Sequence, residues 1–231
     1  MLPWLDEAPV GFPAVTSALN EPDGLLAAGG ALAPEWLLTA YMNGIFPWFN
    51  EDDPILWWSP NPRLVLYPND FRCRRSLTKR IRNGGFTVTI NRCFDRVMYL
   101  CGETRQHTTG TWISPEMCEA YGELHRLGFA HSIEVWHCDD LVGGLYGLAL
   151  GHVFFGESMF SRCPDASKVA LAHLVTLLKQ ANFVMIDCQA HSDHLASLGA
   201  VNIPRETFIN TLGTHASLLR WAPNLRIETI E

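Results

Sequence analysis

The sequence predicts an α+β fold, in which helices flank a mostly antiparallel sheet, and three patterns support that prediction. Two longer runs, 140–149 and 152–160, meet at Gly151-His152 and indicate an antiparallel hairpin. Helical segments alternate with strand-like ones, as expected for a sheet with helices on its faces. Shorter apolar or alternating runs indicate further strands at RLVLY (63–67), FTVTI (86–90), HSIEVWH (131–137) and FVMID (183–187).

The helices follow from the signals at their ends. Pro34 suits a first helical turn because its φ is fixed, and Gly44 suits a helix end because glycine tolerates positive φ. Ser114 is a favourable N-cap, and Asp165 is the cap candidate for a segment with apolar residues at helical spacing. The expected helices are 34–44, 75–83, 114–128, 166–181, 192–199 and a last one opened by Pro204.

The first 62 residues differ from the rest of the chain because they are rich in proline, glycine and tryptophan. The prolines of FPWF (46–49) and WWSPNPR (57–63) argue against regular structure there, and the aromatic rings beside them need a surface to pack on. We therefore expect a small N-terminal domain over residues 1–62 and a larger domain over residues 63–231.

The composition indicates a chain that buries a large core and does not span a membrane. Apolar residues make up 48% of its 231 residues. The longest apolar stretch without charge, 141–156, is shorter than the roughly 20 residues that cross a bilayer. Asp6 and Glu7 interrupt any signal-peptide pattern. Seven scattered cysteines without a Cys-x-x-Cys spacing favour reduced thiols. We expect a cytoplasmic protein.

Charge is unevenly distributed along the chain. The net charge is −7, yet the segment from Arg63 to Arg105 holds ten basic and only three acidic residues. In its densest piece, 72–82, a polyanion such as an RNA backbone would relieve the repulsion between cations. A solvated helix face beside acidic neighbours is the structural alternative. The candidate RNA-binding residues are Arg72, Arg74, Arg75, Lys79, Arg80 and Arg82.

Polar and reactive side chains follow an apolar run in FVMIDCQAHSDH, residues 183–194, and raise three hypotheses. The first is a metal site of Cys188, His191 and His194. No second ligand pair has zinc spacing, so we expect no metal. The second is a cysteine nucleophile. Strand alternation places Cys188 with Ile186 on the buried face, however, and a buried thiol is a poor nucleophile.

The third hypothesis is a polar pocket that needs neither a metal nor a thiol. Asp187 and Gln189 alternate onto the other face of the strand, where they can bond to each other or to one ligand. Glu157 adds a carboxylate in the middle of another apolar strand, where an unpaired charge is costly. A structural hydrogen bond to a loop backbone is the alternative for each of the three.

Nine motifs, in chain order, make the sequence resemble the leucyl/phenylalanyl-tRNA–protein transferase family: EPDGLLAAGGAL, GIFPWF, ILWWSPNPR, HSIEVW, LVGGLYG, FFGESMFSR, DASKVAL, IDCQ and HLASLGA. The resemblance implies a GNAT-like acyltransferase domain with a small N-terminal domain packed on it, and no cofactor. It also implies transfer of leucine or phenylalanine, sometimes methionine, from aminoacyl-tRNA to the α-amine of proteins that begin with arginine or lysine. An adaptor and a protease of the N-degron pathway would then degrade those proteins.

The resemblance also suggests roles for individual residues. The basic stretch would hold the tRNA backbone. Trp48, from the small domain, would stack on the terminal adenine, and Trp112 would lie at the donor site. Asp187 and Glu157 would balance the positive charge of the acceptor, with Asp187 as general base through Gln189. The residue patterns leave open which of these three groups relays the proton. The pocket for the donor side chain would comprise Leu145, Met159, Leu171, Leu174, Leu178 and Ile186.

Two rival functions are an acyl-CoA N-acyltransferase and an RNA-binding module without catalysis. SRCPDASK, residues 161–168, stands where a glycine-rich loop would hold a pyrophosphate, and it offers little to do so, which weighs against CoA. A module that only binds RNA would have no need of two acids and an amide in an apolar pocket.

Overall fold

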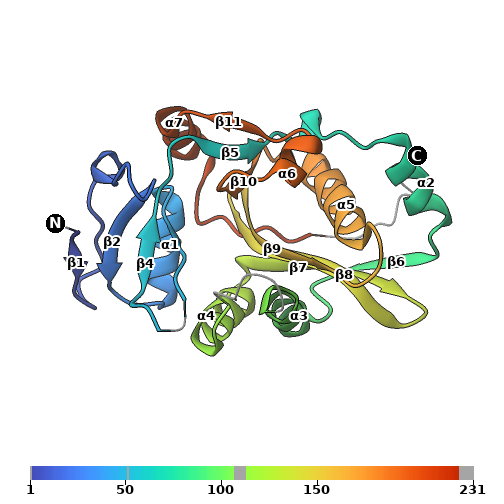
Figure 1. The fold of residues 1–231 in the computed structure, drawn as a ribbon, viewed down its shortest axis with the longest axis horizontal. Coiled ribbons are helices and arrows are strands. Elements are labelled where there is room, and N and C mark those ends of the chain that lie inside the picture. The colour runs from blue at the N-terminus through green and yellow to red at the C-terminus, as the bar shows by residue number, and fades with distance from the viewer. Residues whose placement is uncertain (1, 51, 107–112, 224–231) are drawn as a thin grey trace.

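The computed structural model describes residues 2–50, 52–106 and 113–223 and has the predicted α+β architecture (Figure 1). The strands are β1 (Trp4–Leu5), β2 (Leu25–Gly29), β3 (Phe46–Pro47), β4 (Leu56–Trp58), β5 (Arg63–Leu66), β6 (Phe86–Ile90), β7 (Ala130–His137), β8 (Asp140–Leu150), β9 (Val153–Ser161), β10 (Met185–Gln189) and β11 (Val201–Ile203). The α-helices are α1 (Pro34–Met42), α2 (Arg75–Asn83), α3 (Phe94–Gln106), α4 (Pro115–Arg126), α5 (Ala166–Gln180), α6 (Asp193–Ser197) and α7 (Arg205–His215). Short 3-10 turns η1 (Val15–Ser17) and η2 (Pro68–Asp70) complete the set.

A seven-stranded sheet forms the centre of the chain, in the order β11-β5-β10-β9-β8-β7-β6. Its strand pairs are antiparallel except for β9 and β10, which run parallel. The prediction of a mostly antiparallel sheet is therefore confirmed. The predicted hairpin is β8–β9, and Gly151 takes the positive φ of 59° that its turn requires.

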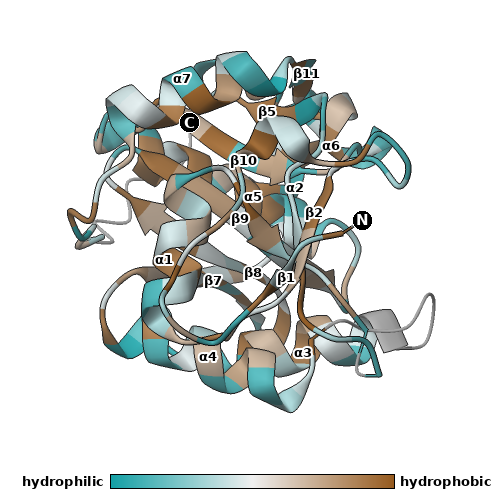
Figure 2. Cartoon of the chain, turned by 90° about the vertical axis from the view of Figure 1, so that its left-hand side faces the viewer, coloured by the Kyte–Doolittle hydropathy of each residue, from teal (hydrophilic) through white to brown (hydrophobic). Residues whose placement is uncertain are grey.

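Helices cover both faces of this sheet, so two hydrophobic clusters form (Figure 1). On one face α3 and α4 pack with α1 and α7 against sheet residues such as Phe155 and Tyr146. On the other face α5 and α2 pack against Ile186, Phe154 and their neighbours. Figure 2 shows the resulting pattern, with apolar colour concentrated on the strands between the helices. The apolar stripe of α5 that the sequence predicts is the side that this second cluster buries.

The N-terminal segment holds a separate four-stranded sheet, in the order β1-β2-β4-β3, beside α1. The expectation that prolines exclude regular structure here was wrong. Pro47 lies in β3, an edge strand that pairs only with β4, and an edge strand tolerates a residue without an N–H. Trp36 and Trp57 belong to the same hydrophobic cluster as Tyr121 and Phe155. The division into domains at residue 62 stays a prediction.

Two further details differ from the sequence prediction. Helix α3 was not predicted at all. Asp165 does not cap α5 with its side chain: it has a left-handed backbone, φ 64°, and its carboxylate pairs with Lys168 at 2.8 Å. All six predicted helices are present, as α1, α2, α4, α5, α6 and α7.

Within the three described stretches, no helix has the length and apolar character needed to cross a membrane.

Candidate active site

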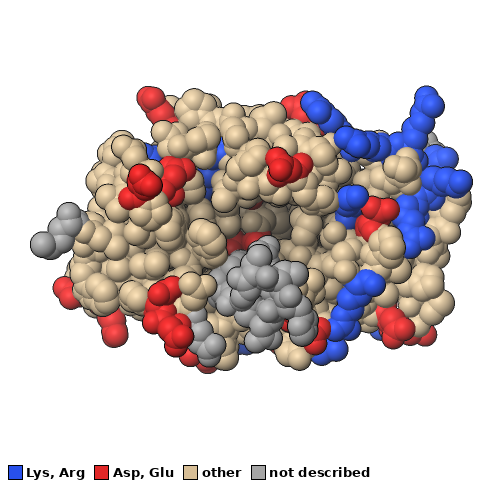
Figure 3. Space-filling view, viewed as in Figure 1, with Lys and Arg blue, Asp and Glu red and all other residues tan. Residues whose placement is uncertain are grey.

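The parallel strands β9 and β10 separate at the middle of the sheet. Their pairing ends at Asp187 opposite Phe155, although β9 continues to Ser161. Beyond this point the two strands are no longer paired, and a cavity of about 440 Å³ lies between them. A hollow is visible near the centre of the face in Figure 3. An opening in a sheet, lined by both strands, is a common place for a ligand site.

Both strands carry a β-bulge at the opening, so regular alternation stops there. Between β8 and β9, the pairing passes from Ser158 to Gly156 and leaves Glu157 as the extra residue. Between β5 and β10, it passes from Asp187 to Gln189, and Gln189 has a positive φ of 64°. A bulge redirects a side chain out of the regular pleat. Despite the bulge, Asp187 and Gln189 reach the same side of β10 as predicted: Asp187 meets Arg63 between Phe46 and Phe208 of the first cluster, and Gln189 meets Glu157. Cys188 packs with Ile186 in the second cluster.

Most of the residues predicted for the site surround this cavity. Leu178 does not: this residue of α5 is fully buried in the second hydrophobic cluster. Trp112 lies outside the described residues. Trp48, contributed by the N-terminal segment, lines the cavity and is 48% exposed. The predicted residues that line the cavity are Trp48, Leu145, Glu157, Met159, Leu171, Leu174, Ile186, Asp187 and Gln189.

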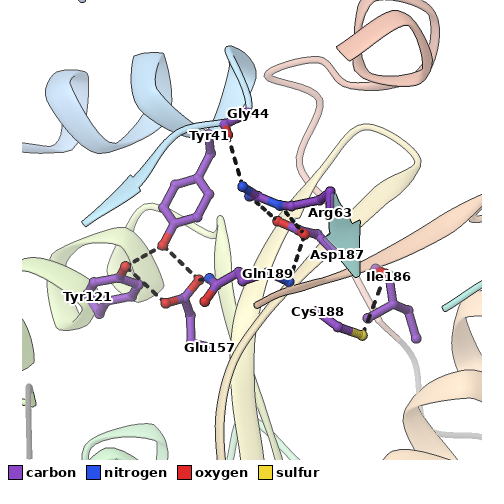
Figure 4. Close-up of polar contacts among 9 residues, drawn as sticks. All are labelled: Tyr41, Gly44, Arg63, Tyr121, Glu157, Ile186, Asp187, Cys188 and Gln189. Atoms are coloured by element: carbon purple, nitrogen blue, oxygen red, sulfur yellow. Dashed lines mark hydrogen bonds and ion pairs between the residues drawn. The ribbon is translucent and has the colours of Figure 1, made fainter. Parts of the chain in front are cut away.

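Glu157 is the centre of a buried hydrogen-bond network (Figure 4). Its Oε1 accepts from the Tyr41 hydroxyl at 2.7 Å and from Nε2 of Gln189 at 2.9 Å. Its Oε2 lies 3.3 Å from the Tyr121 hydroxyl, which also shares a hydrogen bond with the Tyr41 hydroxyl. Burial raises the pKa of Glu157 to about 8, the nearby Asp187 raises it further, and the two tyrosine hydrogen bonds oppose the shift. A large share of this carboxyl group is therefore protonated at neutral pH.

Asp187 forms a different, fully buried pair with Arg63 (Figure 4). Nε of Arg63 donates to Oδ1 at 2.8 Å and Nη2 donates to Oδ2 at 2.7 Å, a bidentate arrangement. Nη1 of Arg63 donates to the Gly44 carbonyl, and the guanidinium stacks between the rings of Phe46 and Phe208. Oδ1 also accepts from the backbone N–H of Gln189 at 3.0 Å. Asp187 thus holds the bulge that presents the Gln189 side chain.

The thiol and the two imidazoles of the segment do not form a reactive cluster. Cys188 packs with the second hydrophobic cluster, and burial raises the pKa of its thiol far above neutral. His191 pairs with the exposed Asp193 at 3.2 Å, and desolvation lowers the pKa of His194. Both histidines line the cavity. Among the residues that the structure describes, no group of three metal-ligating side chains is assembled.

Three residues of the site were missed at the sequence level: Arg63, Tyr41 and Tyr121. Arg63 stands at the start of the apolar strand RLVL, and a cation buried there indicates a buried acid as its partner. The hydroxyls of Tyr41 and Tyr121 lie on otherwise apolar helix faces. Burial raises the pKa of both well above 10, so both hydroxyls remain donors.

The basic stretch comprises most of α2 and the residues just before it, and most of its cations are exposed to solvent. Figure 3 shows Lys and Arg gathered over this helix, to one side of the hollow. Arg80 differs, because it is half-buried and its guanidinium lies 4.8 Å from the Phe86 ring centroid. The exposed members are Arg72, Arg74, Arg75, Lys79 and Arg82.

An apolar cavity between two separating strands, with an amide and a carboxyl group at its base, has the character of an active or ligand-binding site. The sequence model described as leucyl/phenylalanyl-tRNA protein transferase matches residues 65–213, and the model of that family's N-terminal domain matches residues 30–61. The leucyl/phenylalanyl-tRNA–protein transferase of Chromohalobacter salexigens is 60% identical over 94% of this chain and 85% of its own. That of Hydrogenovibrio crunogenus is 59% identical over 90% of this chain and 82% of its own. The chain therefore belongs to the leucyl/phenylalanyl-tRNA–protein transferase family and is a tRNA-dependent aminoacyltransferase.

Solved structures offer more distant likenesses. FemX is 13% identical, with a TM-score of 0.46 over 63% of this chain and 60% of that one. A GCN5-related N-acetyltransferase from Kribbella flavida is 11% identical, with a TM-score of 0.41 over 73% of this chain and 60% of that one. At these scores the two likenesses add nothing to the family assignment.

Proposed function

We propose that this chain transfers leucine or phenylalanine, and in some cases methionine, from aminoacyl-tRNA to the α-amine of proteins that begin with arginine or lysine. A cytoplasmic location and the later degradation of those proteins belong to the same proposal. The observation that carries it is the Gln189–Glu157 pair at the base of an apolar cavity with Trp48 at its mouth.

The cavity suits the end of a charged tRNA. The aliphatic walls from β8, β9, β10 and α5 would take an apolar donor side chain. Trp48 would stack on the terminal adenine, an interaction worth roughly 1–3 kcal/mol. The exposed cations of α2 would contact phosphates and position the tRNA without reading its sequence.

The orientation of Gln189 suggests how the acceptor is held. Its Nε2 is bound to the carboxyl group of Glu157, and its Oε1 has no hydrogen-bond partner within the described residues, so Oε1 can accept from the attacking amine. The amine nitrogen would attack the ester carbonyl carbon. The new C–N bond forms, the ester C–O bond breaks, and the 3′ oxygen of the tRNA leaves with the proton that the amine loses. Positioning of the two reactants would supply much of the rate.

In this proposal Glu157 relays that proton and Asp187 supports the site. Both oxygens of Asp187 are bound by Arg63, so its role in this proposal is to fix the backbone of Gln189. The pKa of Glu157, about 8, is close to the pKa of a free α-amine, about 7.7–8.0. Proton transfer between two groups is most efficient when their pKa values are similar.

Transfer assays test the proposal against the two rival functions. Labelled leucyl-tRNA, phenylalanyl-tRNA and acetyl-CoA are each offered with peptides beginning Arg, Lys or Ala. We expect label on the Arg and Lys peptides from either tRNA, and none from acetyl-CoA. Transfer only from acetyl-CoA would support an acyl-CoA enzyme, and tRNA binding without any transfer would support an RNA-binding module.

A further inference from the structure

A second cavity, of about 150 Å³, adjoins the one that contains Gln189. The two cavities share Phe46, Trp48, Ala190 and His191, so Trp48 stands between them. The second cavity has aromatic and proline walls and one acidic side chain. Its other lining residues are Asp23, Trp58, Pro60, Pro62 and Asn202.

The acids of the first cavity are poorly suited to bind a strongly basic side chain. The carboxylate of Asp187 is fully buried and already paired with Arg63 on both oxygens. Glu157 accepts hydrogen bonds from Tyr41, Tyr121 and Gln189. A guanidinium or ammonium group that entered the first cavity would therefore have to displace an existing partner.

Asp23 differs from both of these acids. It is exposed, its Oδ1 accepts from the backbone N–H of Asn61 at 3.3 Å, and no ion pair engages it within the described part of the chain. Arg205 is close enough to interact with it: burial lowers the pKa of Arg205 and the charge of Asp23 raises it, but the guanidinium donates to the carbonyl of Ser59 and does not line the cavity. Asp23 therefore keeps a free carboxylate oxygen for a ligand.

The walls of the second cavity also favour a cation. The rings of Trp48 and Trp58 lie 5.4 Å apart at 57°, and Trp48 is 48% exposed. Tryptophan is the aromatic side chain that attracts a cation best when the charge lies over its ring face. Trp58 donates from Nε1 to the carbonyl of Trp48 at 2.6 Å, which fixes the two rings relative to each other.

We propose that this second cavity binds the basic side chain of the acceptor's first residue, with Asp23 as its counterion and Trp48 and Trp58 as its aromatic wall. The inference rests on the proposed function, because the acceptor is taken to begin with arginine or lysine. It places the basic side chain on one side of Trp48 and the reacting α-amine on the other, beside Gln189.

Steady-state transfer of labelled leucine to three peptides tests this assignment. The peptides begin with arginine, with citrulline (the uncharged isostere of arginine) or with lysine, and the enzymes are the wild type, Asp23→Asn, Asp23→Glu and Asp6→Asn. Asparagine keeps an oxygen for the Asn61 amide, and Asp6 is an exposed acid of the same segment that lines neither cavity. Thermal midpoints and tRNA affinity are measured for each variant.

We expect Asp23→Asn to raise the KM for the arginine and lysine peptides about fivefold, the effect of losing one exposed ion pair of about 1 kcal/mol, with kcat nearly unchanged. The wild type should prefer arginine over citrulline, and Asp23→Asn should lose that preference. Asp23→Glu and Asp6→Asn should behave like the wild type.

A preference for arginine that survives in Asp23→Asn, or a loss confined to kcat, would overturn this inference and leave the proposed function intact. Absence of transfer by the wild-type enzyme would instead refute the proposed function.

Discussion

Nε2 of Gln189 donates to Oε1 of Glu157 at 2.9 Å, and this bond joins the bulge of β10 to the bulge of β9. The bond spans the point where the two parallel strands separate. Oε1 of Glu157 also accepts from the Tyr41 hydroxyl, so it faces the amide as an acceptor, and the bond turns Nε2 of Gln189 toward Glu157 and Oε1 of Gln189 away from it. The free Oε1 of Gln189 is the group on which the proposed positioning of the amine depends.

Replacing Gln189 tests that dependence. Gln189→Ala removes the acceptor oxygen, so we expect kcat to fall by about 10- to 100-fold, the scale on which loss of positioning acts. Tyr41 and Tyr121 still hold Glu157, so the thermal midpoint should change little. Single-turnover transfer from leucyl-tRNA to an Arg peptide measures the chemical step. A kcat within a factor of two of the wild type would show that the amide does not position the amine.

Removing Arg63 should destabilise the fold strongly. Arg63→Ala leaves the fully buried carboxylate of Asp187 without its partner, and breaking a buried pair in this way costs about 3–5 kcal/mol. Urea denaturation gives the free energy of unfolding. Arg126→Ala is the matched control, because its pair with Glu123 is exposed and is worth at most about 1 kcal/mol. Equal losses in the two variants would contradict a special role for the buried pair.

The titration of Glu157 should make stability depend on pH. Its pKa is raised to about 8, so between about pH 4.5 and pH 8 the folded protein keeps a proton that the unfolded chain has lost. This contribution to the free energy of unfolding therefore decreases as pH rises through that window and levels off above pH 8. Glu157→Gln should remove it. Denaturation curves at pH 5 and pH 9 for both proteins provide the comparison, and identical pH dependences would show that Glu157 titrates normally.

The sequence predicted much of the fold because its local signals agree with the final structure. Pro34 and Ser114 begin helices as expected, and the apolar runs became β5, β6, β7, β8, β9 and β10. Helix α3 was missed although Phe94, Val97 and Met98 have helical spacing and are buried. That pattern would have been sufficient to predict it. The strand β3 could not be predicted locally, because its proline is acceptable only on an edge strand, and strand order decides which strand is at the edge.

The site was predicted in its residue types but not in its connections. An acid, an amide and a second acid in apolar strands indicate a functional pocket. Alternation placed Asp187 and Gln189 on one face, and the backbone N–H of Gln189 does donate to Asp187, but their side-chain partners, Arg63 and Glu157, were not foreseen. These partners are far apart in the chain, and the bulges that aim them depend on the register between strands. Which residues of two strands lie opposite each other cannot be read from the local pattern of either strand.

Exposed cations of α2 should control the affinity for tRNA. Replacing Arg74, Arg75 and Lys79 together with alanine removes three exposed charges, so we expect weaker binding and a salt slope reduced by about 2 to 3. Filter binding at several salt concentrations measures both quantities. Arg80→Ala should mainly lower the thermal midpoint, because this side chain stacks on Phe86. An unchanged salt slope in the triple variant would move the tRNA site away from α2.

The wall of the apolar cavity should set the preference between leucine and phenylalanine as donors. Leu171 lines the cavity from α5, so Leu171→Ala enlarges it and should raise the ratio of kcat/KM for phenylalanyl-tRNA to that for leucyl-tRNA about tenfold. Leu178→Ala is the control from the same helix: it is buried outside the cavity, so it should cost about 2–5 kcal/mol of stability and leave the ratio unchanged. Competition assays with both tRNAs in one reaction give the ratio directly. A shift in Leu178→Ala equal to that in Leu171→Ala would show that general loosening of the core, and not the cavity wall, determines donor choice.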